Sequence, residues 1–396
     1  MSRNLRRYGL ILLGVFTLFL VACSEEMTST PRVPDLMGEG WNEFPGNTET
    51  ECADGSEYSY FVHPGTENKL VIDFQGGGAC WDDGTCSLPI DESNGFGVYN
   101  SLVFGEPESS GVYDKTNPDN PVGDWYHAYI PYCTADIHIG NSTQTYTNPS
   151  DGTQFSVQHK GQVNAQAVLD WVFEEFEAPE TIFVTGCSAG AYGSIAYTPQ
   201  IQANYPEAKV YQMGDCGAGV TPEVFFEGDD GISRWNTESV LAELIPQLDL
   251  SGGLNATFLT NIYETVGETY PESVVSQYNS ALDAIQIYFY ALQQGASFQP
   301  SQEEVQRATQ EWTAGLGASL SMVDESADNF FYYTSLLDGD DNLENGTEHC
   351  IIGRPEFYTY ELDGVPFVSW VDDLVNGRTD ELENVSPNLN GTASLN

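Results

Sequence analysis

The feature that most constrains the fold is a five-residue motif between a predicted strand and a predicted helix. The motif GCSAG at 186–190 follows the β-branched run TIFVT at 181–185 and precedes a helical pattern that begins with AYGSIAY. A G-x-S-x-G sequence in this setting is typical of a tight turn that exposes the serine hydroxyl, here Ser188. A purely structural turn is the alternative, but the flanking strand and helix favour a catalytic serine.

The rest of the chain alternates predicted strands with predicted helices. The helix at 161–176 places apolar side chains on one face, and residues 237–316 are rich in helical pattern and are expected to form a cap or side layer. This alternation predicts an α/β fold with a mainly parallel sheet, in the manner of an α/β-hydrolase. Besides 181–186, the predicted buried strands are 69–74, 125–132, 208–213 and 329–337.

A serine nucleophile needs a base and an acid, which in the α/β-hydrolase order follow the serine along the chain. Of the five histidines, only His349 lies after Ser188, so it is the expected general base. Asp283 lies in an otherwise apolar helical stretch, where an unpartnered carboxylate would be costly, and it is the favoured acid. The alternatives, Asp338, Asp340 and Asp341, form a loop that solvation explains better.

The same chemistry needs backbone N–H groups that stabilise an oxyanion. One comes from the residue after the nucleophile, Ala189, and the others from a glycine-rich loop after an earlier strand. The segment QGGGAC at 75–80, directly after the predicted strand 69–74, supplies such a loop.

Together these segments resemble the pectin acetylesterase family, a group of Notum-like serine esterases that has bacterial members. The resemblance covers about residues 60–376 and rests on FQGGGAC, YCTADIHIG at 132–140, GCSAG with the preceding VNAQAVLDWV helix, ALDAIQI and GTEHC. It implies a triad of Ser188, Asp283 and His349. It also implies that Gly77, Gly78 and Ala189 donate to the oxyanion.

The chain departs from the family where many members carry a tryptophan in the oxyanion loop, because Gly78 and Ala79 stand there. A more open pocket beside the reacting carbonyl is therefore expected. Tyr132, Asp136 and His138 are expected to line the pocket, and the alternative is that Asp136 only caps a loop.

The expected chemistry is ester hydrolysis through an acyl-enzyme, without a metal or organic cofactor. The first hypothesis is the removal of acetyl or other short acyl groups from a polysaccharide outside the cytoplasm. The second is a carboxylesterase or deacylase of longer acyl chains. The third, of another class, is a non-catalytic surface-binding lipoprotein, and the presence of both Ser188 and His349 argues against it.

The N-terminus predicts export and lipidation. Residues 1–22 have a basic start and an apolar run, as in a signal peptide, and LVAC ending at Cys23 resembles the lipobox of bacterial lipoproteins. The expected location is the cell envelope, anchored by lipid and facing outwards, and the expected state is a monomer. A polar tether is predicted over 23–49, one esterase domain over 50–376 and a polar tail over 377–396.

The seven remaining cysteines allow at most three disulfides and one free thiol, which suits an exported protein. Cys80 and Cys86 flank a turn and are expected to pair, and Cys187 and Cys216 are further candidates for disulfide bonding. A zinc site is disfavoured because neither CxxC pairs nor HxxxH spacing occurs.

The charge balance excludes nucleic acid as a partner. The chain of 396 residues has 12 Lys and Arg against 59 Asp and Glu, a formal charge of −47, so it lacks the clustered cations that phosphates require. The acidity favours adaptation to salt over a calcium-binding surface. An acidic enzyme should also be repelled by anionic pectin, so a neutral or salt-screened acetylated glycan is the expected substrate.

Overall fold

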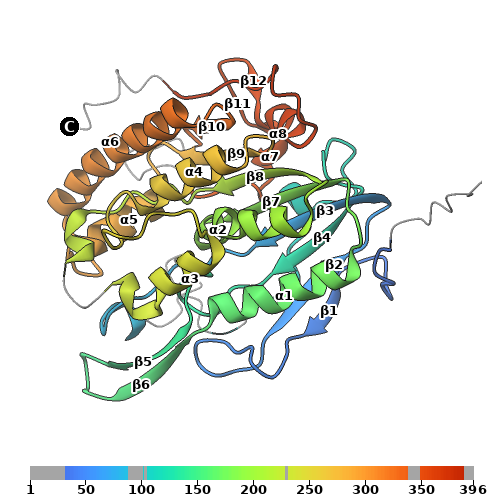
Figure 1. The fold of residues 1–396 in the computed structure, drawn as a ribbon. Coiled ribbons are helices and arrows are strands. Elements are labelled where there is room, and N and C mark those ends of the chain that lie inside the picture. The colour runs from blue at the N-terminus through green and yellow to red at the C-terminus, as the bar shows by residue number, and fades with distance from the viewer. Residues whose placement is uncertain (1–31, 88–100, 102–104, 228–230, 338–347, 388–396) are drawn as a thin grey trace, which may run out of the picture. The chain divides into compact units, whose positions relative to one another are not determined.

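An eight-stranded, mainly parallel sheet forms the centre of the computed structural model, which describes residues 32–87, 101, 105–227, 231–337 and 348–387 (Figure 1). The strand order is β1-β2-β4-β3-β7-β8-β9-β10. The strands from β4 to β10 run parallel, whereas β2 is antiparallel to β4 and β1 is antiparallel to β2. The strands are β1 (Asn42–Pro45), β2 (Ser59–His63), β3 (Glu67–Phe74), β4 (Trp125–Ile130), β7 (Thr181–Cys187), β8 (Lys209–Asp215), β9 (Val274–Ser280) and β10 (Phe330–Ser335).

Both faces of the sheet are buried. Side chains alternate along each strand and so enter two cores, one on either face. In β3, Leu70, Ile72 and Phe74 face one core and Val71 faces the other. The first core packs against α1 (Gly161–Glu175), α2 (Ala189–Asn204), α3 (Thr237–Leu244), α4 (Phe258–Thr269), α5 (Ala284–Gln293) and α6 (Gln302–Ser326). The second core packs against α7 (Glu356–Thr359) and α8 (Phe367–Val375).

Shorter elements lie outside the main sheet and its helices. They are the hairpins β5 (Ser142–Thr147) with β6 (Gln154–His159) and β11 (Glu361–Leu362) with β12 (Val365–Pro366), and the 3-10 turns Thr85–Ser87, Gly111–Tyr113, Glu223–Phe226 and Ile232–Trp235. The predicted α/β-hydrolase-like architecture is confirmed. Each predicted strand also occurs within a few residues of its expected bounds.

Residues 237–316, predicted to be a helix-rich cap or side layer, include one segment that belongs to the sheet itself. Residues 274–280 form β9, which lies between β8 and β10 in the sheet. This strand carries polar side chains that are buried and paired: Ser276 N–H donates to Gln212 Oε1 at 3.2 Å, and Ser276 Oγ donates to Gln212 O at 2.7 Å. A buried strand with satisfied polar residues therefore has no apolar pattern that marks it.

The expected domain bounds also change. Asn42–Pro45 pairs with β2, so the sheet begins inside the predicted tether. At the other end Val385 exchanges backbone hydrogen bonds with β10, so part of the predicted tail is attached to the sheet. The predicted signal peptide and Cys23 lie outside the described residues. None of the described helices is long and apolar enough to cross a membrane.

Three disulfides join cysteines of the described chain: Cys52–Cys133, Cys80–Cys86 and Cys187–Cys350. The structure therefore has the expected Cys80–Cys86 pair. The expectation for Cys216 is wrong, because it is a buried free thiol. Cys187 is bonded instead to a residue 163 positions away, a pairing that local spacing does not reveal.

Candidate active site

Ser188 occupies the sharp turn between β7 and α2. Its φ is positive, with φ 56° and ψ −119°, a backbone conformation that residues with side chains rarely adopt, and its N–H donates to Asp215 O at 2.7 Å. The turn is so tight that a Cβ at Gly190 would lie 1.8 Å from Phe74 O, and one at Gly186 would lie 2.4 Å from Gly190 O. Both motif glycines are thus required by close backbone approach, while the strained serine conformation is of the kind that functional sites hold.

His349 and Asp283 form the second part of the site. His349 Nδ1 lies 2.8 Å from Asp283 Oδ2, and the Asp283 side chain is fully buried. Burial by itself lowers the pKa of His349, but the charge and hydrogen bond of Asp283 outweigh it, so this pKa lies above its usual value. His349 Nε2 has no hydrogen-bond partner among the described residues. It is therefore available to accept a proton.

Asp283 is fixed in position because it caps a helix. Its Oδ1 accepts from the N–H groups of Ile285 at 3.0 Å and Gln286 at 2.9 Å, at the start of α5. The Gln286 amide donates to Oδ2 at 3.0 Å. These bonds leave Oδ2 oriented towards His349, so the end of β9 and the start of α5 together place the carboxylate.

The candidate oxyanion donors converge on the same end of the sheet. Gly77 and Gly78 follow β3, and Ala189 is the first residue of α2. Within the described chain, their three N–H groups donate to no other residue. Gly78 and Ala189 line one pocket with Ser188, and Gly77 lines the adjoining one. This arrangement is suited to binding an anionic oxygen.

Tyr132, Asp136 and His138 do not line these pockets, so the expectation that they contact substrate is wrong. Each side chain is at most 1% exposed. Tyr132 Oη donates to Gly78 O at 2.9 Å, and His138 Nε2 lies 2.8 Å from Gln75 O. Asp136 accepts from Thr134 Oγ1 at 2.6 Å and from a backbone N–H at 2.7 Å, and burial raises its pKa to about 7. Tyr132 and His138 therefore hold the backbone of the glycine loop by hydrogen bonds instead of contacting substrate.

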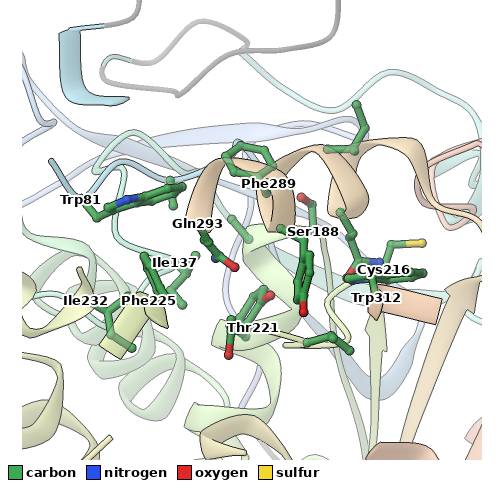
Figure 2. Close-up of a pocket in the computed structure, with 18 of the residues that line it drawn as sticks. Trp81, Ile137, Ser188, Cys216, Thr221, Phe225, Ile232, Phe289, Gln293 and Trp312 are labelled. Atoms are coloured by element: carbon green, nitrogen blue, oxygen red, sulfur yellow. The ribbon is translucent and has the colours of Figure 1, made fainter. Parts of the chain in front are cut away.

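Two pockets meet at Ser188 and His349. The first encloses about 80 Å³ and is lined mainly by apolar side chains, as Figure 2 shows around Ser188. The second encloses about 330 Å³ and is lined by the glycine loop, two tyrosines and Arg354, which pairs with Glu348 at 2.6 Å. The residues shared by both pockets are Gly78, Ser188, Ile285, Phe289 and His349. An ester bond at Ser188 would thus have a separate space on each side.

Sequence reasoning missed two groups of residues. Trp81, Phe225, Phe289 and Trp312 line the first pocket but carry no motif. Asp215, at the end of β8, accepts N–H groups from Ile351 at 3.0 Å and Ile352 at 2.8 Å, just after His349. The one available indication for Asp215 was a carboxylate at the end of a predicted strand.

The described residues offer little for a metal ion. Three groups of potential ligand atoms lie close together, and each contains at least one disulfide-bonded cysteine. A cysteine sulfur in a disulfide is not a thiolate ligand.

Comparison with known proteins places this geometry in context. A family model described as PAE, Pectinacetylesterase, matches residues 45–327. Pectin acetylesterase 11 from Arabidopsis thaliana is 26% identical over 170 residues, a match that spans 42% of either chain. The solved structure of the Wnt deacylase Notum from Drosophila has a TM-score of 0.57 and 15% identity, and the match covers 88% of this chain and 96% of Notum. The Notum likeness concerns the fold.

Proposed function

Because the chain belongs to the pectinacetylesterase family, we propose that it is a serine esterase with Ser188, His349 and Asp283 as its triad. One observation carries the proposal: a strained serine at a strand-to-helix turn shares a pocket with a histidine whose Nδ1 is bonded to a buried carboxylate. That combination is the arrangement a serine nucleophile needs.

In this mechanism His349 Nε2 takes the hydroxyl proton of Ser188 as Oγ attacks the ester carbonyl carbon. Asp283 holds the imidazole in the tautomer with a proton on Nδ1 and stabilises the imidazolium that forms. The raised pKa of His349 is consistent with this support. His349 then gives the proton to the leaving alcohol, and the acyl group remains on Ser188.

The N–H groups of Gly77, Gly78 and Ala189 stabilise the oxyanion of the tetrahedral intermediate. Deacylation repeats the steps with water: His349 takes a proton from water, hydroxide adds to the acyl carbon, and Ser188 leaves with the proton returned. The free acid is released, and every group is restored.

For the substrate we propose acetyl or other short acyl esters on a polysaccharide. The acyl group would enter the small apolar pocket, and the alcohol side would occupy the larger pocket, where the Gln75 amide and the Arg354 guanidinium offer hydrogen bonds to a sugar. The net charge of −47 favours a neutral glycan or salt-screened conditions. The three disulfides support an extracytoplasmic location.

The test is acetate release from a panel of acetylated polysaccharides, neutral and anionic, across a salt series. Ser188→Ala should abolish release from every active substrate, whereas the matched control Ser150→Ala, in an exposed turn, should leave it unchanged. If folded Ser188→Ala kept wild-type esterase activity, the triad assignment would fail and a non-catalytic binding role would gain support. Absence of activity on all acetylated glycans would refute the substrate proposal alone.

The apolar lining of the first pocket favours a second candidate, a carboxylesterase for somewhat longer acyl chains. The pocket volume of about 80 Å³ is several times the roughly 10–15 Å³ that one buried water needs. An acetyl group fills only part of this space. Burial of each further CH₂ contributes about 0.8 kcal/mol.

A series of p-nitrophenyl esters from acetate to octanoate separates the two candidates. A kcat/KM that falls steadily from acetate supports the short-acyl proposal. A maximum at intermediate length supports the second candidate, and it should move to longer chains in Trp81→Ala, which enlarges the pocket. Phe298→Ala, on an exposed side chain outside this pocket, is the control.

A further inference from the structure

We infer that the Cys187–Cys350 disulfide is a positioning device that fixes the general base against the nucleophile. The inference rests on the proposed triad. Cys187 directly precedes Ser188, and Cys350 directly follows His349, so the bond joins the neighbours of two reacting residues. The two Cα atoms it joins are 6.1 Å apart although the sequence separation is 163.

The two ends of this bond differ in their support. Cys187 is the last residue of β7, which hydrogen-bonds to β3 and β8 on either side. His349 lies in no helix or strand, between β10 and α7. The rigid element is therefore β7, which precedes Ser188. The disulfide fixes the loop that contains His349 relative to this strand.

Noncovalent contacts also restrain the base loop, on both sides of His349. Before it, Glu348 N–H donates to Leu337 O at 2.7 Å. The Asp215 carboxylate accepts the N–H groups of Ile351 and Ile352, and Cys350 N–H donates to Cys216 Sγ at 3.1 Å. The contact of His349 itself is the bond to Asp283. Loss of the disulfide would leave these contacts in place, so the loop should stay attached while the approach of His349 to Ser188 loosens.

A loosened base affects chemistry more than binding. Displacement of a reacting group by about 1 Å can lower a rate about 100-fold. Removal of both cysteines should therefore lower kcat by about 100-fold with a smaller change in KM, because both cysteines line the second pocket but neither lines the first. If the disulfide only stabilised the fold, its removal would lower the unfolding temperature. At temperatures where the protein is folded, kcat would stay unchanged.

The variant for this test is Cys187→Ala combined with Cys350→Ala. Both cysteines must be removed, since Cys350 alone would lie beside the thiol of Cys216 and could form a new bond. The matched control is Cys52→Ala with Cys133→Ala, which also opens a long loop, of sequence separation 81. Kinetics with p-nitrophenyl acetate, circular dichroism and thermal unfolding are measured for all three proteins.

Reduction of the wild-type enzyme tests the same point if the double variant fails to fold. A water-soluble phosphine cleaves the S–S bond: phosphorus gives two electrons and takes oxygen from water, and the sulfurs become thiols. Mass spectrometry after alkylation reports each disulfide separately. Activity should fall with the reduced fraction of Cys187–Cys350, not with that of Cys52–Cys133, and reoxidation should restore it.

The outcomes separate this inference from the proposed function. A folded double variant with wild-type kcat overturns the positioning role, as does full activity after complete reduction of this bond. Loss of activity in the Cys52–Cys133 control to the same extent also overturns it. If Ser188→Ala stays active, the proposed function itself has failed, whatever the cysteine variants do.

Discussion

Replacement of Asp283 by Asn separates the proposed catalytic role of this carboxylate from its structural role. Asn caps helices about as well as Asp, so Oδ1 can still accept from Ile285 and Gln286 at the start of α5. At the Oδ2 position, however, an amide NH₂ would face two donors, His349 Nδ1–H and the Gln286 amide. His349 must then turn or adopt the other tautomer, which removes the lone pair needed at Nε2.

The expected effects differ strongly in size. The wrong tautomer in a triad lowers kcat by about 10⁴-fold, which corresponds to about 5.4 kcal/mol in activation free energy. The loss in unfolding free energy is that of the two hydrogen bonds to Oδ2, about 1.5–3 kcal/mol each. Asp283→Asn should therefore be folded and nearly inactive.

The pH dependence of activity tests the hydrogen bond between His349 and Asp283 independently. Activity needs neutral His349, so kcat/KM falls as the pH drops through the pKa of this imidazole. Asp283 raises that pKa, and the acid limb of the wild-type profile should lie above the usual imidazole value of 6.5. Without the carboxylate the pKa falls, and the limb of the residual activity should move to lower pH.

The assay is p-nitrophenyl acetate hydrolysis from pH 4 to 9, with thermal unfolding at each pH. The control is Asp249→Asn, an exposed aspartate that accepts from Ser251 N–H at 2.9 Å and lies outside both pockets. A folded Asp283→Asn with kcat within about tenfold of wild type would refute the reasoning. The acid would then be sought elsewhere, first in the loop carboxylates.

Three further predictions concern the turn, the charge and the N-terminus. Gly190→Ala should abolish soluble folded protein, because its Cβ would meet Phe74 O at 1.8 Å; a folded, active variant would contradict the tight turn. The unfolding temperature should rise with NaCl towards 1 M, where the Debye length is about 3 Å, and a fall would refute self-repulsion as the dominant effect of the −47 charge. Cys23→Ala should move the protein from the membrane to the soluble fraction with unchanged kcat/KM, and continued membrane retention would exclude a lipid anchor at Cys23.

The core of the fold was predictable because local pattern and topology agree there. The strand–GCSAG–helix unit at 181–204 combines β-branched residues, glycines at close contacts and a helix start, and each indicates the same structure. Chain order then selected His349, since no other histidine follows Ser188. The order of the three residues along the chain follows from the topology of the fold.

The predictions from sequence failed where buried polar side chains form hydrogen bonds inside the protein. β9 lies inside the segment predicted to be rich in helix, and its Ser276 and Gln277 are at most 2% exposed. Ser276 bonds to Gln212 on the neighbouring strand β8, and Gln277 Oε1 accepts from the Asn279 amide on the same strand, and a pattern based on hydrophobic period does not reveal such bonds. The same holds for Asp136, whose buried oxygens accept bonds from Thr134 and from Gly161.

The disulfides mark the second limit. Cys80 and Cys86 are close in sequence and flank a turn, so proximity alone indicates their pairing. Cys187 and Cys350 are brought together only when the sheet places the end of β7 beside the loop after β10. The spacing of cysteines along the sequence does not reveal such a long-range pair. The fold brings Cys187 and Cys350 together.

The tryptophan missing from the oxyanion loop shows why a local departure from a family pattern does not translate directly into an open pocket. Ala79 stands where a large side chain is common, but Trp81, two residues later, lines the apolar pocket beside Ser188. It packs edge-on against Phe225, with ring centroids 5.2 Å apart, and also contacts Phe289. The aromatic bulk is therefore supplied from another backbone position. Acyl-chain selectivity should accordingly depend on Trp81 and Phe289, and substitution of Ala79 should have the smaller effect in the ester series.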